Sequence, residues 1–383
     1  MKTSLPIKLV PKGWGFEKWI VNCEEYCGKL LYFVKDKRCS WHYHKLKDEV
    51  FYIQSGKILV KFSEQDDLNK ASEIILGPGD NFHVYRGLRH QMVALEDTEL
   101  FEFSTQHFDE DSYRIERGDC HEEGLLASKP AIRATNERIG DFVFPHNALT
   151  EIRNHPMHDV IHKYISETLR PWIKEDTCVL DIGANFGFTS CLFASLLNEL
   201  NGGKVIAFEA SPIVYPFLKE NLENNISNKF ENVEVETYWG AVYDTLTTVS
   251  FPQPTPEFGE YGMYGVGVGA RVKKGRSGKY WKIPTLTIDS LNLPEKISAI
   301  KIDTQGADLK ALMGAKETII RNQCAILFEF ESKMETDSTI NDFINFFDSI
   351  NYRIEKSVKH DYLVLPKDPT DDSLVYFCAS QVR

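Results

Sequence analysis

Histidine and carboxylate residues near the N-terminus have the spacing of metal ligands. His42 and His44 alternate along a short β-type segment, so both imidazoles face the same side of a strand. Glu49 follows them closely, and His90 lies in a later segment that could pair across a barrel. Three or four ligands of this kind suit zinc, iron, manganese or nickel. We predict that His42, His44, Glu49 and His90 hold one divalent metal ion, the alternative being a set of buried structural histidines.

A glycine-containing turn near the middle of the chain is typical of a nucleoside site. Residues 179–187 join an apolar strand to a helix, with glycines at positions where the backbone turns tightly. The spacing Gly-x-x-x-Gly differs from the Gly-x-Gly-x-x-Gly that holds a pyrophosphate at a helix N-terminus. One strand later, Glu209 stands where an acidic residue accepts both ribose hydroxyls in doubly wound sheets. Asp181 and Glu209 therefore predict a nucleoside that carries an amino acid. Packing glycines and a surface glutamate are the alternative.

Two patterns of strand and helix divide the chain. Closely spaced strand-like runs separated by glycine and acidic turns predict an all-β N-terminal domain, a sandwich or small barrel. After a polar stretch the pattern alternates between strands and helices, which predicts a mostly parallel sheet. We place the first domain at 1–118, a linker at 119–140 and the second domain at 141–383. Each domain is expected to bury a core of its own and to act independently. The expected strands are 29–34, 49–54, 57–62, 98–103, 178–182, 204–208, 232–238, 299–302, 325–330, 361–365 and 374–378, the last two antiparallel, and the expected helices are 159–172, 187–200, 215–224, 307–320 and 340–350.

The second domain resembles the FkbM family of class I methyltransferases. The resemblance is carried by residues 181–187, by Ile283 to Leu291, and by Ile300 to Asp308 followed by Leu312 to Ala315. It implies a Rossmann-like seven-stranded sheet and transfer of a methyl group from S-adenosylmethionine to a hydroxyl of a sugar or polyketide ring. Where the family usually has Val-Glu, this chain has Thr304-Gln305. The implied cofactor contacts are Asp181, Gly183, Ala184, Asn185, Gly187, Glu209, Ala210 and Ala241.

Methyl transfer from a sulfonium needs alignment and removal of a hydroxyl proton, for which carboxylates suffice. Asp303 lies at the carboxyl end of a central strand, where open α/β sheets bind ligands, so we predict that it orients or deprotonates the acceptor. Glu329 is the second candidate. The alternatives are a helix-capping role for Asp303 and a solubilising role for Glu329.

The first domain resembles the cupins of sugar-phosphate and nucleotide-sugar enzymes, which are jelly-roll β-barrels. His42-x-His44, Glu49 and Gly56 match the first cupin motif, and Pro78-Gly79-Asp80 to His90 matches the second. Such cupins often have Pro-Pro-Gly before the last histidine, whereas this chain has Tyr85-Arg86-Gly87. The resemblance implies a metal-binding domain that binds or isomerises carbohydrate.

Composition limits the partners. A net charge of −12 argues against nucleic acid and anionic membranes, because both require a concentrated basic face. Apolar runs are only strand-length and the N-terminus lacks an apolar signal region, so we expect a cytoplasmic protein. A small sugar or nucleotide sugar is the expected substrate, and association into a homodimer is left open. The alternative function is a carbohydrate sensor whose second domain binds cofactor with little turnover.

Overall fold

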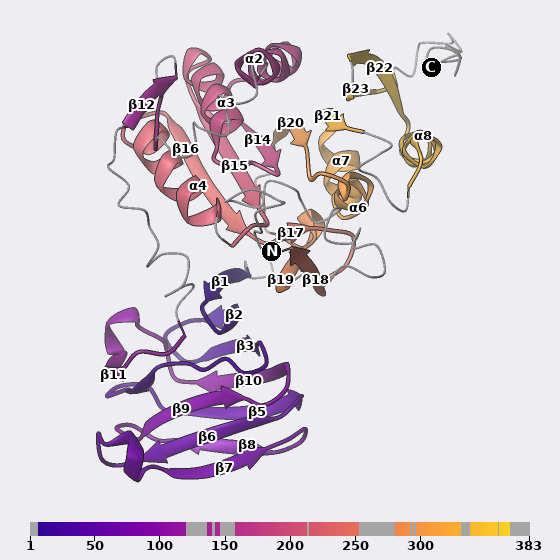
Figure 1. Cartoon of the computed structure of the whole chain (residues 1–383). Helices are drawn as coiled ribbons and strands as arrows, with labels where there is room; N and C mark the ends of the chain where they lie inside the picture. The colour runs from indigo at the N-terminus through magenta and orange to yellow at the C-terminus, as the bar shows by residue number, and fades with distance from the viewer. Residues whose placement is uncertain are drawn as a thin grey trace.

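The N-terminal domain is built from two antiparallel sheets around one apolar core (Figure 1). The computed structural model describes residues 7–119, 136–139, 142–145, 158–212, 214–252, 280–291, 293, 296–330, 338–358 and 360–367. In β5 burial alternates, so that Glu49, Phe51 and Ile53 all point inward. The predicted all-β domain is confirmed. One sheet has the order β1 (Lys8–Lys12), β2 (Gly15–Asn22), β3 (Cys27–Phe33), β10 (Thr98–Ser104), β5 (Glu49–Ser55) and β8 (Asn81–Val84), and the other has the order β11 (Tyr113–Glu116), β4 (Trp41–Tyr43), β9 (Arg89–Ala94), β6 (Ile58–Ser63) and β7 (Ser72–Leu76).

The C-terminal domain contains a seven-stranded mixed sheet. Five strands are parallel to their neighbours, and the last two are antiparallel. The order is β16 (Val233–Trp239), β15 (Gly203–Glu209), β14 (Thr177–Ile182), β20 (Ile297–Ile302), β21 (Ala325–Glu329), β23 (Asp361–Pro366) and β22 (Tyr352–Val358). The helices are α2 (His158–Leu169), α3 (Phe188–Glu199), α4 (Val214–Leu222), α6 (Asp308–Met313), α7 (Lys316–Asn322) and α8 (Ile340–Ser349).

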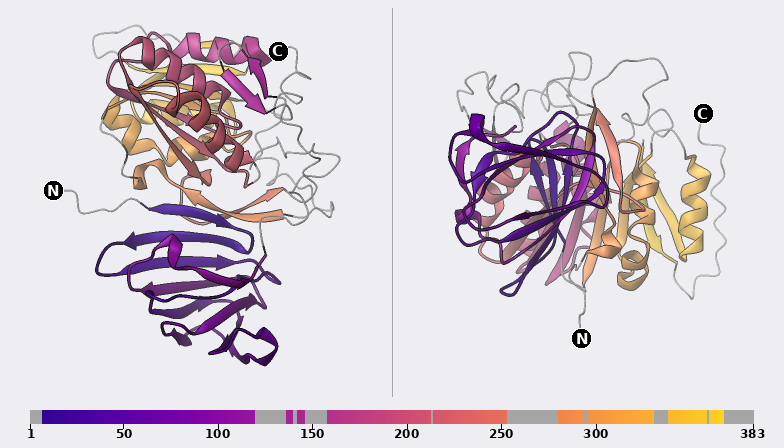
Figure 2. Two further views of the ribbon diagram at one scale, coloured as in Figure 1. Left: turned by 90° about the vertical axis from the view of Figure 1, so that its left-hand side faces the viewer. Right: turned by 90° about the horizontal axis from the view of Figure 1, so that it is seen from below.

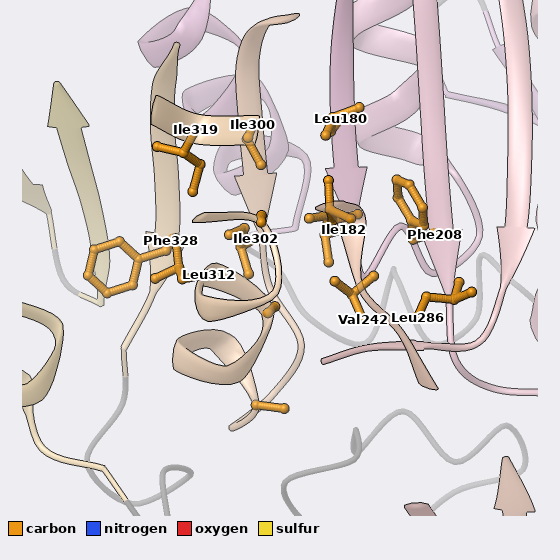
Figure 3. Close-up of a cluster of buried hydrophobic side chains, with 14 of the residues drawn as sticks. Leu180, Ile182, Phe208, Val242, Leu286, Ile300, Ile302, Leu312, Ile319 and Phe328 are labelled. Carbon is orange, nitrogen blue, oxygen red and sulfur yellow. The ribbon is translucent and has the colours of Figure 1, made fainter. Parts of the chain in front are cut away.

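Apolar side chains cover both faces of this sheet, as the continuous hydrophobic runs of its central strands require. Leu180 and Ile182 of β14 join one cluster, with residues of α6, α7 and α8, and Val179 joins the other, with residues of α2 and α3. Figure 3 shows the first cluster, where Phe208 and Ile302 lie close to the carboxyl ends of their strands. The sheet is therefore buried between two layers, and its carboxyl edge is left to carry polar residues.

Several boundaries differ from expectation. The helix expected at 307–320 is two short helices that meet at Gly314 and Ala315. At Gly314 the chain passes so close to Tyr243 that a Cβ would lie 1.9 Å from its carbonyl oxygen, so glycine is needed there. An antiparallel pair does close the sheet, but it joins 352–358 to 361–366; the strand expected at 374–378 lies outside the described residues. Most of the expected linker also lies outside them. Short elements that were not anticipated are β12 (Asn136–Ile139), β13 (Phe142–Pro145), β17 (Ala241–Val242), β18 (Thr248–Pro252), β19 (Tyr280–Leu286), and the turns at Leu68–Lys70, Asp109–Asp111, Glu223–Ser227 and Ile288–Ser290.

The two domains share apolar contacts. Leu9, Phe16 and Tyr32 of the first domain belong to the same buried cluster as Trp239 of the second. Figure 1 and the left view of Figure 2 show β1, β2 and the small β17-β19-β18 sheet at this junction. The expectation of two separate cores is thus only partly right. In the part of the chain that the structure describes, no helix is both long and apolar enough to span a membrane.

Candidate functional sites

Gly183 brings the ends of two central strands together. Its φ is +77°, and a Cβ at this position would lie 1.8 Å from the carbonyl oxygen of Asp303, so only glycine fits. The backbone N–H groups of Gly183 and Ala184 donate to the carbonyl of Phe208, at 3.0 and 2.9 Å. At the far end of the loop Gly187 has φ +89° and packs against Leu222. The loop is therefore held between β15 and β20 at the carboxyl edge of the sheet.

Glu209 is tied to this loop through backbone donors. Its Oε2 accepts a hydrogen bond from the Asn185 N–H at 2.9 Å, and its Oε1 accepts one from the Ser211 N–H at 2.7 Å. Burial raises the pKa of Glu209, an effect that these donors partly oppose. Asn185 has a buried Oδ1 without a hydrogen-bond partner among the described residues. Since such an atom costs free energy when left alone, it suits contact with a polar ligand.

The other predicted cofactor residues lie around the same edge. Ala210 follows Glu209, and Ala241 begins β17 one residue beyond the end of β16, after Gly240. Ala184 is buried among the apolar residues behind the loop, so its contribution there is through the backbone. The structure thus brings the eight residues to the ends of three adjacent strands, β14, β15 and β16.

Lys301 lies buried between two carboxylates and was not anticipated. Its Nζ is 3.2 Å from Asp181 Oδ1 and 3.7 Å from Asp303 Oδ2, and it donates to the Gly183 carbonyl at 2.9 Å. Burial lowers the pKa of Lys301, but Asp181 and Asp303 together raise it above its usual value. Asp181 itself is fully buried, and its Oδ2 accepts from the Ser190 hydroxyl at 2.6 Å. Asp181 therefore holds Lys301 and the loop rather than facing open space.

Gln305 connects the two predicted catalytic carboxylates. Its Nε2 donates to Asp303 Oδ1 and to Glu329 Oε2, both at 2.8 Å. Burial, followed by the charge of Asp303, raises the pKa of Glu329 to about 9. The residue at the N-cap of helix α6 (Asp308–Met313) is Ala307, so Asp303 does not cap this helix. Asp303, about a third exposed, is left to face a ligand.

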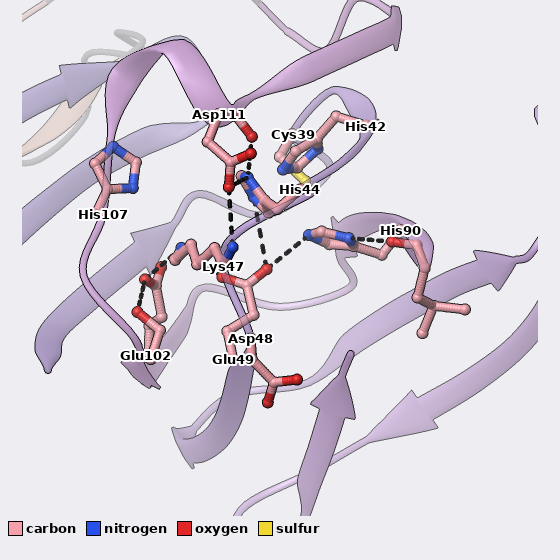
Figure 4. Close-up of polar contacts among 12 residues, drawn as sticks. Cys39, His42, His44, Lys47, Asp48, Glu49, His90, Glu102, His107 and Asp111 are labelled. Atoms are coloured by element: carbon pink, nitrogen blue, oxygen red, sulfur yellow. Dashed lines mark hydrogen bonds and ion pairs between the residues drawn. The ribbon is translucent and has the colours of Figure 1, made fainter. Parts of the chain in front are cut away.

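Three imidazoles of the N-terminal domain meet at one point (Figure 4). His42 and His90 are direct partners between β4 and β9, and His44 follows on the strand end. One nitrogen from each of the three rings lies within 4.8 Å of the others, which makes them the group among the described residues that could hold a metal ion. Glu49 is not part of that group, although its Oε1 is 3.2 Å from His90 Nε2 and 3.7 Å from His44 Nε2.

Each imidazole is oriented in the same way by the backbone. Nδ1 lies 2.8 Å from the Ser40 carbonyl in His42, 2.6 Å from the Asp111 carbonyl in His44, and 3.2 Å from the Leu88 carbonyl in His90. Because a carbonyl only accepts, each Nδ1 carries the proton and each Nε2 keeps its lone pair. Burial lowers the pKa of His42 and of His44, and neighbouring imidazoles lower that of His42 further. Neutral rings with directed lone pairs are what metal coordination requires.

A buried network of opposite charges continues from Glu49. Lys47 Nζ lies 2.5 Å from both Glu49 Oε2 and Glu102 Oε1, and Lys29 Nζ lies 3.6 Å from the same Glu102 oxygen. Burial raises the pKa of Glu49, but the charge of Lys47 opposes this effect, and the pKa lies well below its usual value. The Oε1 atom of Glu49 is buried without a hydrogen bond of good geometry within the described ranges. It is thus an available oxygen beside the imidazoles.

These groups line a cavity of about 700 Å³. Its walls come from both sheets and from the turn between β1 and β2. The volume is large enough for a sugar-sized ligand. Its lining includes charged side chains of both signs, among them Lys12, Glu17, Lys29, Lys47, Glu102 and Arg114.

Comparison with known families identifies both domains. Residues 31–103 match the cupin domain, and residues 181–354 match the methyltransferase FkbM domain. This chain joins a cupin domain to an FkbM methyltransferase domain. The metal-ligand candidates lie inside the cupin match, and Asp181, Glu209, Asp303 and Glu329 lie inside the methyltransferase match.

Solved structures resemble a part of the chain. KdgF from Halomonas sp. is 21% identical, with a TM-score of 0.22, and the match covers 25% of this chain and 81% of that protein. CapF, a capsular polysaccharide assembling protein from Staphylococcus aureus, is 18% identical over 30% of this chain and 35% of its own, with a TM-score of 0.27. Oxalate decarboxylase from Bacillus subtilis is 16% identical over 30% and 33%, with a TM-score of 0.26. At TM-scores this low, nothing further about this chain follows from them. The comparison with curated proteins found no match.

The raised pKa of Glu329 makes the stability of the methyltransferase domain depend on pH. Between the usual value of 4.5 and about 9, the folded state retains a proton that the unfolded state releases, so stability falls as pH rises. Glu329→Gln mimics the protonated form and removes this loss. In urea unfolding, the free energy of unfolding of the variant relative to that of the wild type should increase by about 1–3 kcal/mol from pH 5 to pH 8. For Glu199→Gln, at an exposed position, the difference in free energy of unfolding from the wild type should stay constant over this pH range. A constant difference for Glu329→Gln as well would contradict the raised pKa.

Proposed function

We propose that the C-terminal domain transfers the methyl group of S-adenosylmethionine to a hydroxyl oxygen of a sugar or glycoconjugate. The order of its sheet supports this proposal: β15 and β16 lie on one side of β14, the parallel β20 and β21 lie on the other, and an antiparallel pair ends the sheet beyond them, as expected for a Rossmann-like class I methyltransferase. The observation that carries the proposal is the polar edge of this sheet. Glu209 and Asn185 lie at one end of that edge, and Asp303, Gln305 and Glu329 lie beside it.

The residues present suit this cofactor. The unpaired Asn185 Oδ1 and the Glu209 carboxylate offer acceptors for ribose hydroxyls. When bound, S-adenosylmethionine supplies an electrophilic methyl group on a sulfonium that leaves as a neutral thioether. The remaining chemistry belongs to the acceptor.

Asp303 is placed to act on that acceptor. Its carboxylate would accept the proton of the acceptor hydroxyl as that oxygen becomes methylated. The Lys301 ammonium lies 3.7 Å from Asp303 Oδ2 as a nearby positive charge. Gln305 fixes the Asp303 carboxylate by donating to Oδ1. Glu329, protonated at neutral pH, adds no second negative charge to compete for the proton.

The proposal is tested by incubating the full chain with methyl-labelled S-adenosylmethionine and a panel of nucleotide sugars, then identifying products by mass spectrometry. We expect label on a sugar hydroxyl. Cofactor binding without transfer to any member of the panel would favour the alternative of a carbohydrate sensor, and absence of cofactor binding would contradict the assignment altogether.

For the cupin domain we propose a site for one divalent metal that binds or isomerises carbohydrate of the same class. His42, His44 and His90 would hold the ion through Nε2, with the free Oε1 of Glu49 as the fourth ligand. The supporting observation is that a backbone carbonyl faces Nδ1 in all three rings. The ion would supply a Lewis acid that polarises a hydroxyl or carbonyl oxygen of the ligand. Lys47 and Glu102 lie beside it to position that ligand.

Removing two imidazoles should empty the metal site. We expect His42→Ala/His44→Ala to lower the metal content of the purified chain from about one ion to less than about a tenth of an ion, because two ligands cannot retain what four hold. Elemental analysis measures this. The matched control is His83→Ala, a more exposed cupin histidine paired with Asp48, which should keep its metal. Equal metal content in the double variant and the wild type would reduce the histidines to core residues.

A further inference from the structure

Strand β2 of the cupin domain takes part in two sites. Because side chains alternate along a strand, neighbouring residues point to opposite faces of the sheet. Glu17 points into the cupin cavity, where its carboxylate lies 3.1 Å from Lys12 Nζ and 3.8 Å from Lys29 Nζ. Phe16 points the other way, into the apolar cluster of the methyltransferase domain, and is 3% exposed. The two domains therefore share this strand.

Aromatic rings connect Phe16 to the methyltransferase sheet. Phe16 stacks on Tyr32 of β3, with ring centroids 5.2 Å apart and planes at 16°. On its other side it meets Trp239 edge to face, at 6.1 Å and 67°. Trp239 is 2% exposed, and its Nε1 has no hydrogen-bond partner within the described part of the chain. The indole is therefore held by packing rather than by a hydrogen bond.

Trp239 ends β16 directly beside the proposed cofactor site. It is the register partner of Glu209 in the parallel pair of β15 and β16. The next residue, Gly240, donates its N–H to the Glu209 carbonyl at 3.0 Å and has φ +141°, with a Cβ position only 3.1 Å from the Pro284 carbonyl oxygen. Ala241, one of the predicted cofactor contacts, follows at once. A displacement of the indole would therefore move the backbone on which the cofactor rests.

We infer that Phe16, a cupin residue, is a positioning residue for cofactor binding in the methyltransferase domain, because it fixes Trp239 and, through Trp239, the segment from Glu209 to Ala241. The inference rests on the proposed binding of S-adenosylmethionine. Phe16 is connected to the site through Trp239, which pairs with Glu209, and we therefore assign it a role in cofactor binding rather than in the transfer step. Its loss should therefore raise KM for the cofactor and leave kcat nearly unchanged.

The test uses the full chain and calorimetric binding of S-adenosylmethionine. Phe16→Ala should weaken binding about tenfold, and Phe16→Leu, which keeps apolar volume but loses the ring, about threefold. Phe103→Ala and Phe103→Leu are the matched controls, because Phe103 lies in the same cupin sheet and is 57% exposed. Both controls should bind like the wild type. All four variants should keep their cupin metal, which a general loss of the cupin fold would not allow.

A double-mutant cycle separates positioning from a general loss of stability. If Phe16 acts through Trp239, Phe16→Leu/Trp239→Leu should bind no more weakly than Trp239→Leu alone. Additive losses, or equal affinity for the Phe16 and Phe103 variants, would overturn the inference while leaving the proposed function intact. If Phe16→Ala does not fold, the two leucine variants decide the question. A wild-type chain that does not bind S-adenosylmethionine would contradict the proposed function and the inference with it.

Discussion

Asp303→Asn is expected to lower turnover about 100-fold or more while leaving cofactor affinity and stability close to those of the wild type. The amide is nearly isosteric and still accepts from Gln305 Nε2, but it cannot take the acceptor proton. The substitution removes the partly exposed charge of Asp303, while Lys301 keeps Asp181 as its buried partner. Steady-state rates with the acceptor found in the transfer assay, together with calorimetry, measure both effects.

Glu329→Gln is the matched control for this prediction. Because the pKa of Glu329 is raised to about 9, its carboxyl is already protonated at neutral pH, and an amide there changes little. We expect its turnover to stay within about tenfold of the wild type. The reverse pattern, with Asp303→Asn near the wild-type rate and Glu329→Gln strongly impaired, would transfer the role of base to Glu329.

Lys301→Met should destabilise the chain by about 3–5 kcal/mol, since it leaves the fully buried Asp181 carboxylate without its counter-charge. The side chain of Lys301 is 5% exposed, so water cannot replace the lost ammonium. Urea unfolding measures the change. Cofactor affinity should fall as well, because the Gly183 carbonyl loses its donor.

Two further variants make this prediction specific. Lys296→Met removes a lysine whose side chain is 69% exposed and whose partner, Asp176, is 87% exposed, so it should cost no more than about 0.5 kcal/mol. Adding Asp181→Asn to Lys301→Met should recover part of the loss, since no isolated charge then remains buried. Equal costs for Lys301→Met and Lys296→Met would show that the buried ion pair does not stabilise the fold.

The location of both candidate sites could be predicted from local pattern. His42 lies in β4 and His44 directly after its end, and the alternation of an extended chain directs both rings to the same side. Gly183 and Glu209 follow the carboxyl ends of successive parallel strands, which always meet at one edge of the sheet. In each case the geometry follows from the period of the strand and from the hand of the crossover, which depend on few residues.

Tertiary structure decided which further side chains join these sites. Lys301 stands in a run of apolar strand residues, and nothing near it in the sequence shows that Asp181, more than a hundred positions earlier, neutralises its charge. In the sequence, Gln305 stands where the family usually has a carboxylate, which suggests a lost function. In the structure its amide joins Asp303 to Glu329, because β21 lies beside β20. From the sequence, Phe16 is an ordinary residue of the β-barrel. Only the contact between the two domains brings its ring against Trp239. Strand periodicity thus determined on which side of a strand the reactive side chains lie. Long-range packing alone decided which charges, amides and rings meet at the sites. Those contacts join segments that are far apart in the sequence, and no local pattern predicts them.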